Sequence, residues 1–256
     1  MRLLIATTNR GKVAEFRRLL AGMEFELDDL TGYPNVPVVE ETGCGFIANA
    51  CLKAAYYARG LDSWTLADDS GLAVDHLGGK PGLHSARWAQ MHGEPEGDAA
   101  NNALLLRQLE GVCDEKRTAR FVCSLALSDA RGRIVLTATD WVAGRILRQP
   151  AGEGGFGYDP LFFVESHGMT TAQMGAAEKD AVSHRGRALR RLALLMESAH
   201  LREAQRRGVS PRAGTARLCA GALTFQRNCR LNVAHEPNSG CRKQPVGGKK
   251  TRPAGG

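Results

Sequence analysis

Short apolar runs alternate with helical repeats of apolar residues along the first two thirds of the chain. The run RLLIA at 2–6 predicts a buried strand. After a polar turn, 13–22 places apolar residues on one helical face and ends at a glycine. The segment 36–45 is expected to be extended, and the Ala-rich segment 46–60 predicts a second helix. This order of strand, polar loop and helix is typical of open α/β folds, which bind ligands at such loops.

Two adjacent acids, Asp68 and Asp69, interrupt the next apolar run, in the segment WTLADDSG (64–71). We interpret 64–71 as a strand that passes into a loop at these acids. Adjacent carboxylates repel each other, and burial raises the cost. The pair therefore marks either an exposed turn or a place where a cation and a polar substrate bind.

The rest of the pattern completes the predicted fold. It predicts a helix at 99–111 capped by Asp98, a hairpin of strands at 120–129 and 133–147, a strand at 160–164 and an amphipathic helix at 185–205. Mixed strands and helices indicate an α/β fold with a partly antiparallel sheet.

The periodicity fails after about residue 205, where the chain becomes rich in Gly, Pro and Arg. We therefore expect a folded domain at 1–204 and a basic, disordered tail at 205–256. The tail holds eleven Lys and Arg and one acid, which gives it a net charge of +10. Because the whole chain carries +7, the domain carries −3. A basic tail on an acidic domain leaves a nucleic-acid-binding protein as an alternative, with non-specific binding through the tail.

Other features of the composition exclude several classes of protein. No apolar stretch reaches the roughly 20 residues that span a bilayer, and the short apolar start does not fit a signal peptide. The seven scattered cysteines fit reduced thiols better than a disulfide framework. We expect a cytoplasmic protein with no membrane contact.

Acidic and basic residues follow several of the predicted elements. Glu40 and Glu41 end an extended run, and with Asp68 and Asp69 they place four acids at two expected strand ends. Carboxylates at such a site suit Mg²⁺, which keeps waters and phosphates as its other ligands. Each pair taken alone is more typical of a solvated turn, so a joint metal site and two exposed turns both stay open.

Three further segments offer groups that bind phosphate or an aromatic base. TTNRGK (7–12) leads into a helix whose backbone N–H groups and lysine can cradle a phosphate, although the motif taken alone is more typical of an ordinary capped helix. GEGGFG (152–157) is followed by a predicted strand, which excludes a dinucleotide fingerprint; its glycines allow close approach to a ligand on which Phe156 or Tyr158 can stack. EKDAVSHRG (178–186) offers basic donors or a solvated turn.

Together these motifs resemble those of the noncanonical purine nucleoside triphosphate pyrophosphatases, the inosine/xanthosine triphosphatase family. The resemblance covers about 1–198 and is carried, in family order, by TTNRGK, EETGCGFIANACLKA, ADDSGLAVDHLGGKPGLHSAR, GGFGYDPLFF and KDAVSHRGRAL. It implies hydrolysis of ITP, dITP and XTP to the monophosphate and pyrophosphate with Mg²⁺, a homodimer, and an elongated mixed sheet with flanking helices whose two lobes enclose a central cleft.

The resemblance also implies roles for single residues. Asp69 would be the proton acceptor and a metal ligand, and Glu40 the second metal ligand. The substrate would be held by Thr7, Thr8, Asn9, Arg10, Gly11, Lys12, Lys53, Ser70, Phe156, Gly157, Tyr158, Asp159, Lys179, His184 and Arg185. Ala48 departs from the family, which often has Glu there, and the tail has no counterpart. A related pyrophosphatase that prefers modified pyrimidine triphosphates is the alternative among enzymes.

Overall fold

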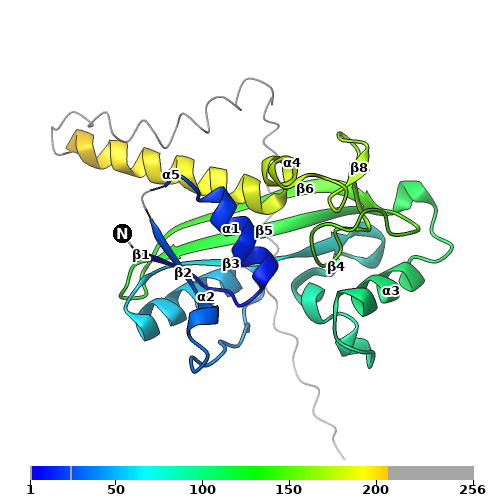
Figure 1. Ribbon diagram of the computed structural model, residues 1–256, viewed down its shortest axis with the longest axis horizontal. Coiled ribbons are helices and arrows are strands. Elements are labelled where there is room, and N and C mark those ends of the chain that lie inside the picture. The colour runs from blue at the N-terminus through cyan, green and yellow to red at the C-terminus, as the bar shows by residue number, and fades with distance from the viewer. Residues whose placement is uncertain (1, 24, 207–256) are drawn as a thin grey trace, which may run out of the picture.

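One long mixed sheet runs through the molecule in the computed structural model, which describes residues 2–23 and 25–206 (Figure 1). The strands follow the order β2 (Glu26–Asp29), β1 (Arg2–Ile5), β3 (Trp64–Val74), β5 (Thr118–Ser128), β6 (Ile134–Ile146), β7 (Phe162–Val164) and β8 (Met169–Thr170), with β4 (Lys80–Pro81) paired to β3. β1 is parallel to β2 and β3, and every other pairing is antiparallel. The predicted mixed α/β fold is confirmed.

Helices cover both faces of this sheet (Figure 1). The α-helices are α1 (Arg10–Leu19), α2 (Phe46–Leu61), α3 (Asp98–Gln108), α4 (Ala176–Val182) and α5 (His184–Arg206). Short 3₁₀ segments complete the chain: η1 (Leu30–Gly32), η2 (Asp75–Leu77), η3 (Gly82–Arg87), η4 (Gln90–His92) and η5 (Asp114–Lys116). Among the described residues no helix is both long enough and apolar enough to span a bilayer.

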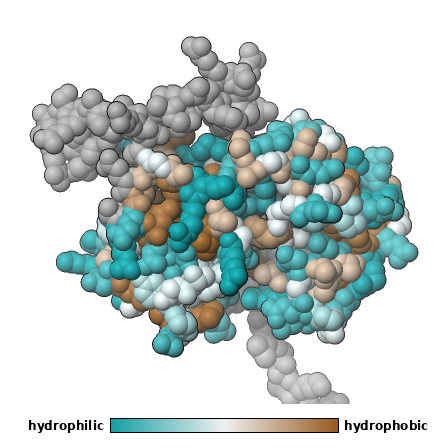
Figure 2. All heavy atoms as spheres, viewed as in Figure 1, coloured by the Kyte–Doolittle hydropathy of each residue, from teal (hydrophilic) through white to brown (hydrophobic). Residues whose placement is uncertain are grey.

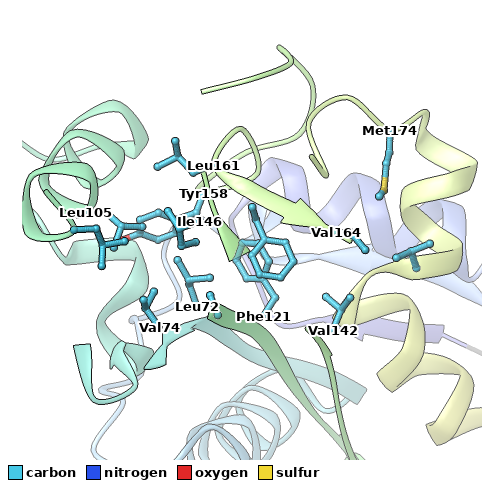
Figure 3. Packing of buried hydrophobic residues seen from close by; sticks show 14 residues of the cluster. Leu72, Val74, Leu105, Phe121, Val142, Ile146, Tyr158, Leu161, Val164 and Met174 are labelled. Carbon is cyan, nitrogen blue, oxygen red and sulfur yellow. The ribbon is translucent and has the colours of Figure 1, made fainter. Parts of the chain in front are cut away.

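The apolar core is divided along the long strands. At one end, α1 and α5 pack on one face of the sheet around Phe16 and Leu66, and α2 packs on the opposite face around Ala54 and Ala67. At the other end a separate cluster joins α3, the outer halves of β3, β5 and β6, and the segment leading into β7 (Figure 3). The surface in the view of Figure 2 is largely hydrophilic, with hydrophobic patches between the polar residues.

The prediction that the strand ends in a loop at Asp68 and Asp69 is wrong. β3 continues to Val74, and its pairing with β5 runs unbroken from Thr65 to Val74. The apolar residues after Gly71 continue the strand pairing with β5. The two acids can be buried in the strand because a cation lies beside each of them, one on each face of the sheet. Gly71 serves close packing rather than a turn, since a Cβ there would collide with the carbonyl of Gly82.

Asp98 is not the helix cap that the sequence predicts. Gly97 is the N-cap of α3 and makes no side-chain cap bond, and Asp98 is the first helical residue. Its carboxylate accepts a hydrogen bond from Gly157 instead. The hairpin of β5 and β6, the strand β7 and the helix α5 are confirmed. The predicted tail lies almost wholly beyond the described residues, so the domain boundary stays a prediction.

Candidate active site

Asp68 and Asp69 point to opposite faces of the sheet, because successive side chains of a strand alternate. Asp68 lies on the face covered by α1 and α5, and Asp69 on the face covered by α2. Both are buried, with relative exposures of 3% and 5%. The alternation separates two charges that are adjacent in sequence and gives each its own set of partners.

Asp68 is surrounded by cations. It accepts a hydrogen bond from Lys12 Nζ at 2.5 Å and two from Arg185, through Nε at 3.3 Å and Nη2 at 3.2 Å. Burial opposes its charge, but Lys12 and Arg185 more than offset this and hold the pKa of Asp68 well below its ordinary value. Asp68 is therefore a fixed anion that orders two cations.

The charged network continues from Arg185 through α1. Arg185 pairs with Glu15, which also binds Lys179 Nζ at 2.7 Å, and Lys179 in turn binds Asp159 at 2.5 Å. Burial alone would raise the pKa of Glu15, yet Arg185 and Lys179 lower it to about 2. Arg185 also donates to Ser70 Oγ at 3.0 Å. These buried pairs fix the cations that the sequence predicts as substrate contacts.

Asp69 has a different environment on the α2 face. Asn49 Nδ2 donates to it at 3.0 Å, and Lys53 Nζ lies 3.4 Å away. Burial and the nearby Glu41 raise the pKa of Asp69, with Lys53 and Asn49 acting against them. Lys53 bridges to Glu41 at 2.7 Å, whereas Glu40 is exposed. A carboxylate with a raised pKa is suited to accept a proton.

The loop before α1 is held by its own polar side chains. Asn9 caps the helix by accepting from the Lys12 backbone N–H at 3.0 Å, and the Thr7 hydroxyl accepts from the Asn9 N–H at 3.2 Å. Thr8, Asn9 and Arg10 are exposed. The helix start thus presents backbone N–H groups and the Lys12 ammonium at one point, where phosphate oxygens can bind.

The glycine-rich segment reaches back over this helix start. A Cβ at Gly11 would lie 2.5 Å from the Phe156 ring, so only glycine permits the contact. The ring lies 4.9 Å from Lys179 Nζ and 5.8 Å from the Arg185 guanidinium. The Tyr158 ring is instead part of the core, with its hydroxyl donating to the Ser85 carbonyl at 2.9 Å. Of the two aromatic candidates, Phe156 is the one at the charged network.

His184 lies beside this network as an uncharged ring. It stacks on Phe121 with centroids 4.8 Å apart and an interplanar angle of 13°. Burial, and then the charge of Arg185, lower the pKa of His184 to about 3. Its Nδ1 is buried and has no hydrogen-bond partner among the described residues. At neutral pH this ring can offer one N–H donor.

Comparison with known proteins assigns the chain to a family. A model described as the Ham1 family matches residues 3–194. The chain belongs to the Ham1 family. It is 49% identical over 191 residues to the dITP/XTP pyrophosphatase of Geobacillus kaustophilus, covering 74% of this chain and 91% of that protein. It is 51% identical over 205 residues to the dITP/XTP pyrophosphatase of Mycolicibacterium paratuberculosis, covering 77% and 96%.

Solved structures of Ham1 proteins share the fold. A HAM1 protein from Coxiella burnetii is 38% identical, with a TM-score of 0.68 and coverage of 77% of this chain and 99% of that one. A nucleoside-triphosphatase / dITP/XTP pyrophosphatase from Mycobacterium abscessus is 46% identical, with a TM-score of 0.59 and coverage of 74% and 97%. The resemblance stated from the motifs is therefore confirmed.

The Ham1 fold brings most of the predicted site residues into two adjoining groups. One group lies on the Asp68 face: Lys12, Ser70, Phe156, Asp159, Lys179, His184 and Arg185. The other, on the Asp69 face, holds Lys53. Glu40 is exposed, and its carboxylate makes no hydrogen bond or ion pair with either group among the described residues. Sequence reasoning missed Glu15, whose signal was its spacing of three from Lys12 on one helical face.

Proposed function

We propose that this Ham1 protein hydrolyses ITP, dITP and XTP to the nucleoside monophosphate and pyrophosphate, which removes these nucleotides from the pool. The observation that carries the proposal is the pair of neighbouring acids on β3. Asp68 orders Lys12 and Arg185 on one face, and Asp69 lies beside Lys53 and Asn49 on the other. The names of the relatives supply the substrate class.

The triphosphate is bound, in this proposal, by the segment 7–12 together with Lys53. The start of α1 presents N–H groups to phosphate oxygens, and the two lysines supply the balancing charge. Water attacks the phosphorus nearest the nucleoside, and Asp69 accepts its proton. The bond to the leaving pyrophosphate then breaks, with the bond electrons staying on the pyrophosphate oxygen. Asn49 keeps the Asp69 carboxylate oriented through its 3.0 Å bond.

The donor set around Asp69 fits Mg²⁺. Its carboxylate lies near the Glu41 carboxylate, and these hard oxygen donors suit a cation that takes one or two carboxylates along with substrate phosphates. The described residues contain no cluster of three metal-ligating side chains. When bound, Mg²⁺ would neutralise phosphate charge. We propose Asp69 as its ligand. The resemblance to the family implies Glu40 as the second ligand, whereas in the structure the acid close to Asp69 is Glu41.

Base selection is proposed to occur where Phe156 meets the cations. Phe156 would stack on the purine, and Gly157, Tyr158 and Asp159 would hold the segment that carries it. The 6-keto oxygen accepts hydrogen bonds, whereas a 6-amino group would turn its own hydrogens toward N–H donors and leave them unpaired. Lys179, His184 and Arg185 are the donors at this end of the site.

The assembly and location of the protein are further parts of the proposal. Trp141 and Val135, both on β6, are 45% and 47% exposed, and we propose that they are buried against a second copy in a homodimer. Its nucleotide substrates favour a cytoplasmic location. Nucleic acid is not required for this activity, and the tail at 205–256 is proposed to be dispensable for it.

A nucleotide panel with Asp69→Asn tests the proposal. ITP, dITP, XTP, the four common triphosphates and a modified pyrimidine triphosphate are assayed with Mg²⁺, with pyrophosphate and phosphate measured separately. We expect pyrophosphate from the first three, and a loss on the order of 100-fold or more in Asp69→Asn. Glu26→Gln, an exposed acid on β2, is the control. Phosphate as the main product would refute the reaction, and near-normal turnover in folded Asp69→Asn would transfer the proton-accepting role to Asp68.

A further inference from the structure

One turn of α3 holds both backbone hydrogen-bonding groups of Gly157. The Gly157 N–H donates to the Asp98 carboxylate at 2.6 Å, and the Gly157 carbonyl accepts from Asn102 Nδ2 at 3.0 Å. Asp98 and Asn102 are four residues apart and therefore lie on the same face of the helix. We call this pair of contacts the α3 clamp.

The backbone around Gly157 is shaped for this contact. Gly157 has a φ of +64°, in the left-handed region that favours glycine. A residue in that conformation can turn its N–H and its carbonyl toward a single helix. On the other side, Gly97 caps α3 without a side-chain bond, and the Asp98 carboxylate is free to reach Gly157. The clamp therefore depends on the residue that the sequence alone assigned to helix capping.

The clamped residue lies between two aromatic side chains with different surroundings. Tyr158 is buried in the apolar cluster with Leu105 of α3, and both are labelled in Figure 3. Phe156, on the other side, extends to Gly11 and to the cations Lys179 and Arg185. Gly157 thus connects α3 directly to the aromatic ring of the site. A shift of Gly157 would displace Phe156.

The clamp is not explained by stability alone. Asn102 directs its amide nitrogen to Gly157, and its Oδ1 is buried without a hydrogen-bond partner among the described residues. A buried unpaired carbonyl oxygen is unfavourable. Buried polar atoms that lack a hydrogen-bond partner are expected at functional positions.

We propose that Asp98 and Asn102 are positioning residues that hold Phe156 at the place where it stacks on the purine base. The inference rests on the proposed function. It states that contacts from α3 determine the affinity of the site for the purine base. Asp98 and Asn102 contact neither the 7–12 segment nor Lys53, so their loss can reach the phosphate site only through the contact of Phe156 with Gly11.

The first experiment separates base binding from phosphate binding. Asp98→Ala, Asn102→Ala and the conservative Asp98→Asn are compared with Glu96→Ala, a control that removes an exposed acid two residues before the clamp. Both Ala variants are expected to raise KM for ITP by about 10-fold with kcat within about 2-fold, because each loses a hydrogen bond to Gly157, charge-assisted for Asp98, and weakens the stacking of Phe156 on the base. Asp98→Asn should recover most of the affinity. The inhibition constant of inorganic tripolyphosphate, which has no base, should change much less than KM for ITP.

A double-mutant cycle with Phe156→Ala shows whether the clamp acts through this ring. If it does, Asp98→Ala raises KM in the wild type but adds little in the Phe156→Ala background. Additive effects would overturn the inference, as would a parallel loss of tripolyphosphate binding, which would indicate general loosening of the fold.

Hydrogen–deuterium exchange tests the clamp without any turnover. In Asp98→Ala, peptides covering 152–158 should exchange faster than in the wild type and in Glu96→Ala, while peptides covering α2 should not change. Unchanged exchange at 152–158 would overturn the inference. Absence of ITP hydrolysis by the wild type would instead refute the proposed function, so the two failures are distinguishable.

Discussion

The buried, uncharged His184 should make the protein lose stability as the pH falls from 7 to 5. The pKa of His184 is lowered from 6.5 to about 3, by burial and then by the charge of Arg185. Between these values the unfolded chain binds a proton at this position and the folded protein does not. Stability is therefore retained above about pH 6.5 and is lost progressively below it.

The size of the loss follows from the two pKa values. Linkage gives about 2 kcal/mol less stability at pH 5 than at pH 7 from this residue. His184→Phe keeps a ring that can stack on Phe121, 4.8 Å away, and removes both the titration and the unpaired Nδ1. The variant should therefore lose about 2 kcal/mol less than the wild type over the same interval. Other groups that titrate in this range cancel in the difference.

Urea unfolding followed by far-UV circular dichroism at pH 5, 6 and 7 measures this difference. The wild type, His184→Phe and His76→Gln are compared; His76 is exposed, and its variant should follow the wild type. Equal losses in the wild type and in His184→Phe would refute the reasoning, because they would show that His184 is protonated in the folded state.

Two further predictions concern α1. Glu15→Gln should destabilise the protein by about 3 kcal/mol in urea unfolding at pH 7, because it leaves Arg185 and Lys179 without their shared buried anion. The control is Glu178→Gln, which changes an exposed acid. Equal stability of the two variants would contradict the role of the network. Gly11→Ala should raise KM for ITP roughly 10-fold, because the new Cβ displaces the Phe156 ring. Gly60→Ala is the matched control, because a Cβ at Gly60 would meet no neighbouring atom. An unchanged KM in Gly11→Ala would show that Phe156 does not contribute to base binding.

Local patterns in the sequence determined much of the fold and many of the candidate residues. Apolar patterns predicted β1, α1, the β5–β6 hairpin and α5, and alanine content predicted α2, because a strand or a helix is specified by residues close in sequence. The ordered motifs placed the chain in its family. They also predicted the cations Lys12, Lys179 and Arg185, which the fold brings to one network.

Only the tertiary structure decided how these residues act on one another. The sequence predicts that the strand ends in a loop at Asp68 and Asp69, but pairing with β5 along its whole length includes both acids in β3 and places them on opposite faces. Glu15 becomes an internal anion only because α4 and α5 bring Lys179 and Arg185 to it. The clamp on Gly157 joins residues 59 positions apart. Such contacts depend on long-range packing and strand register, which the local pattern does not encode.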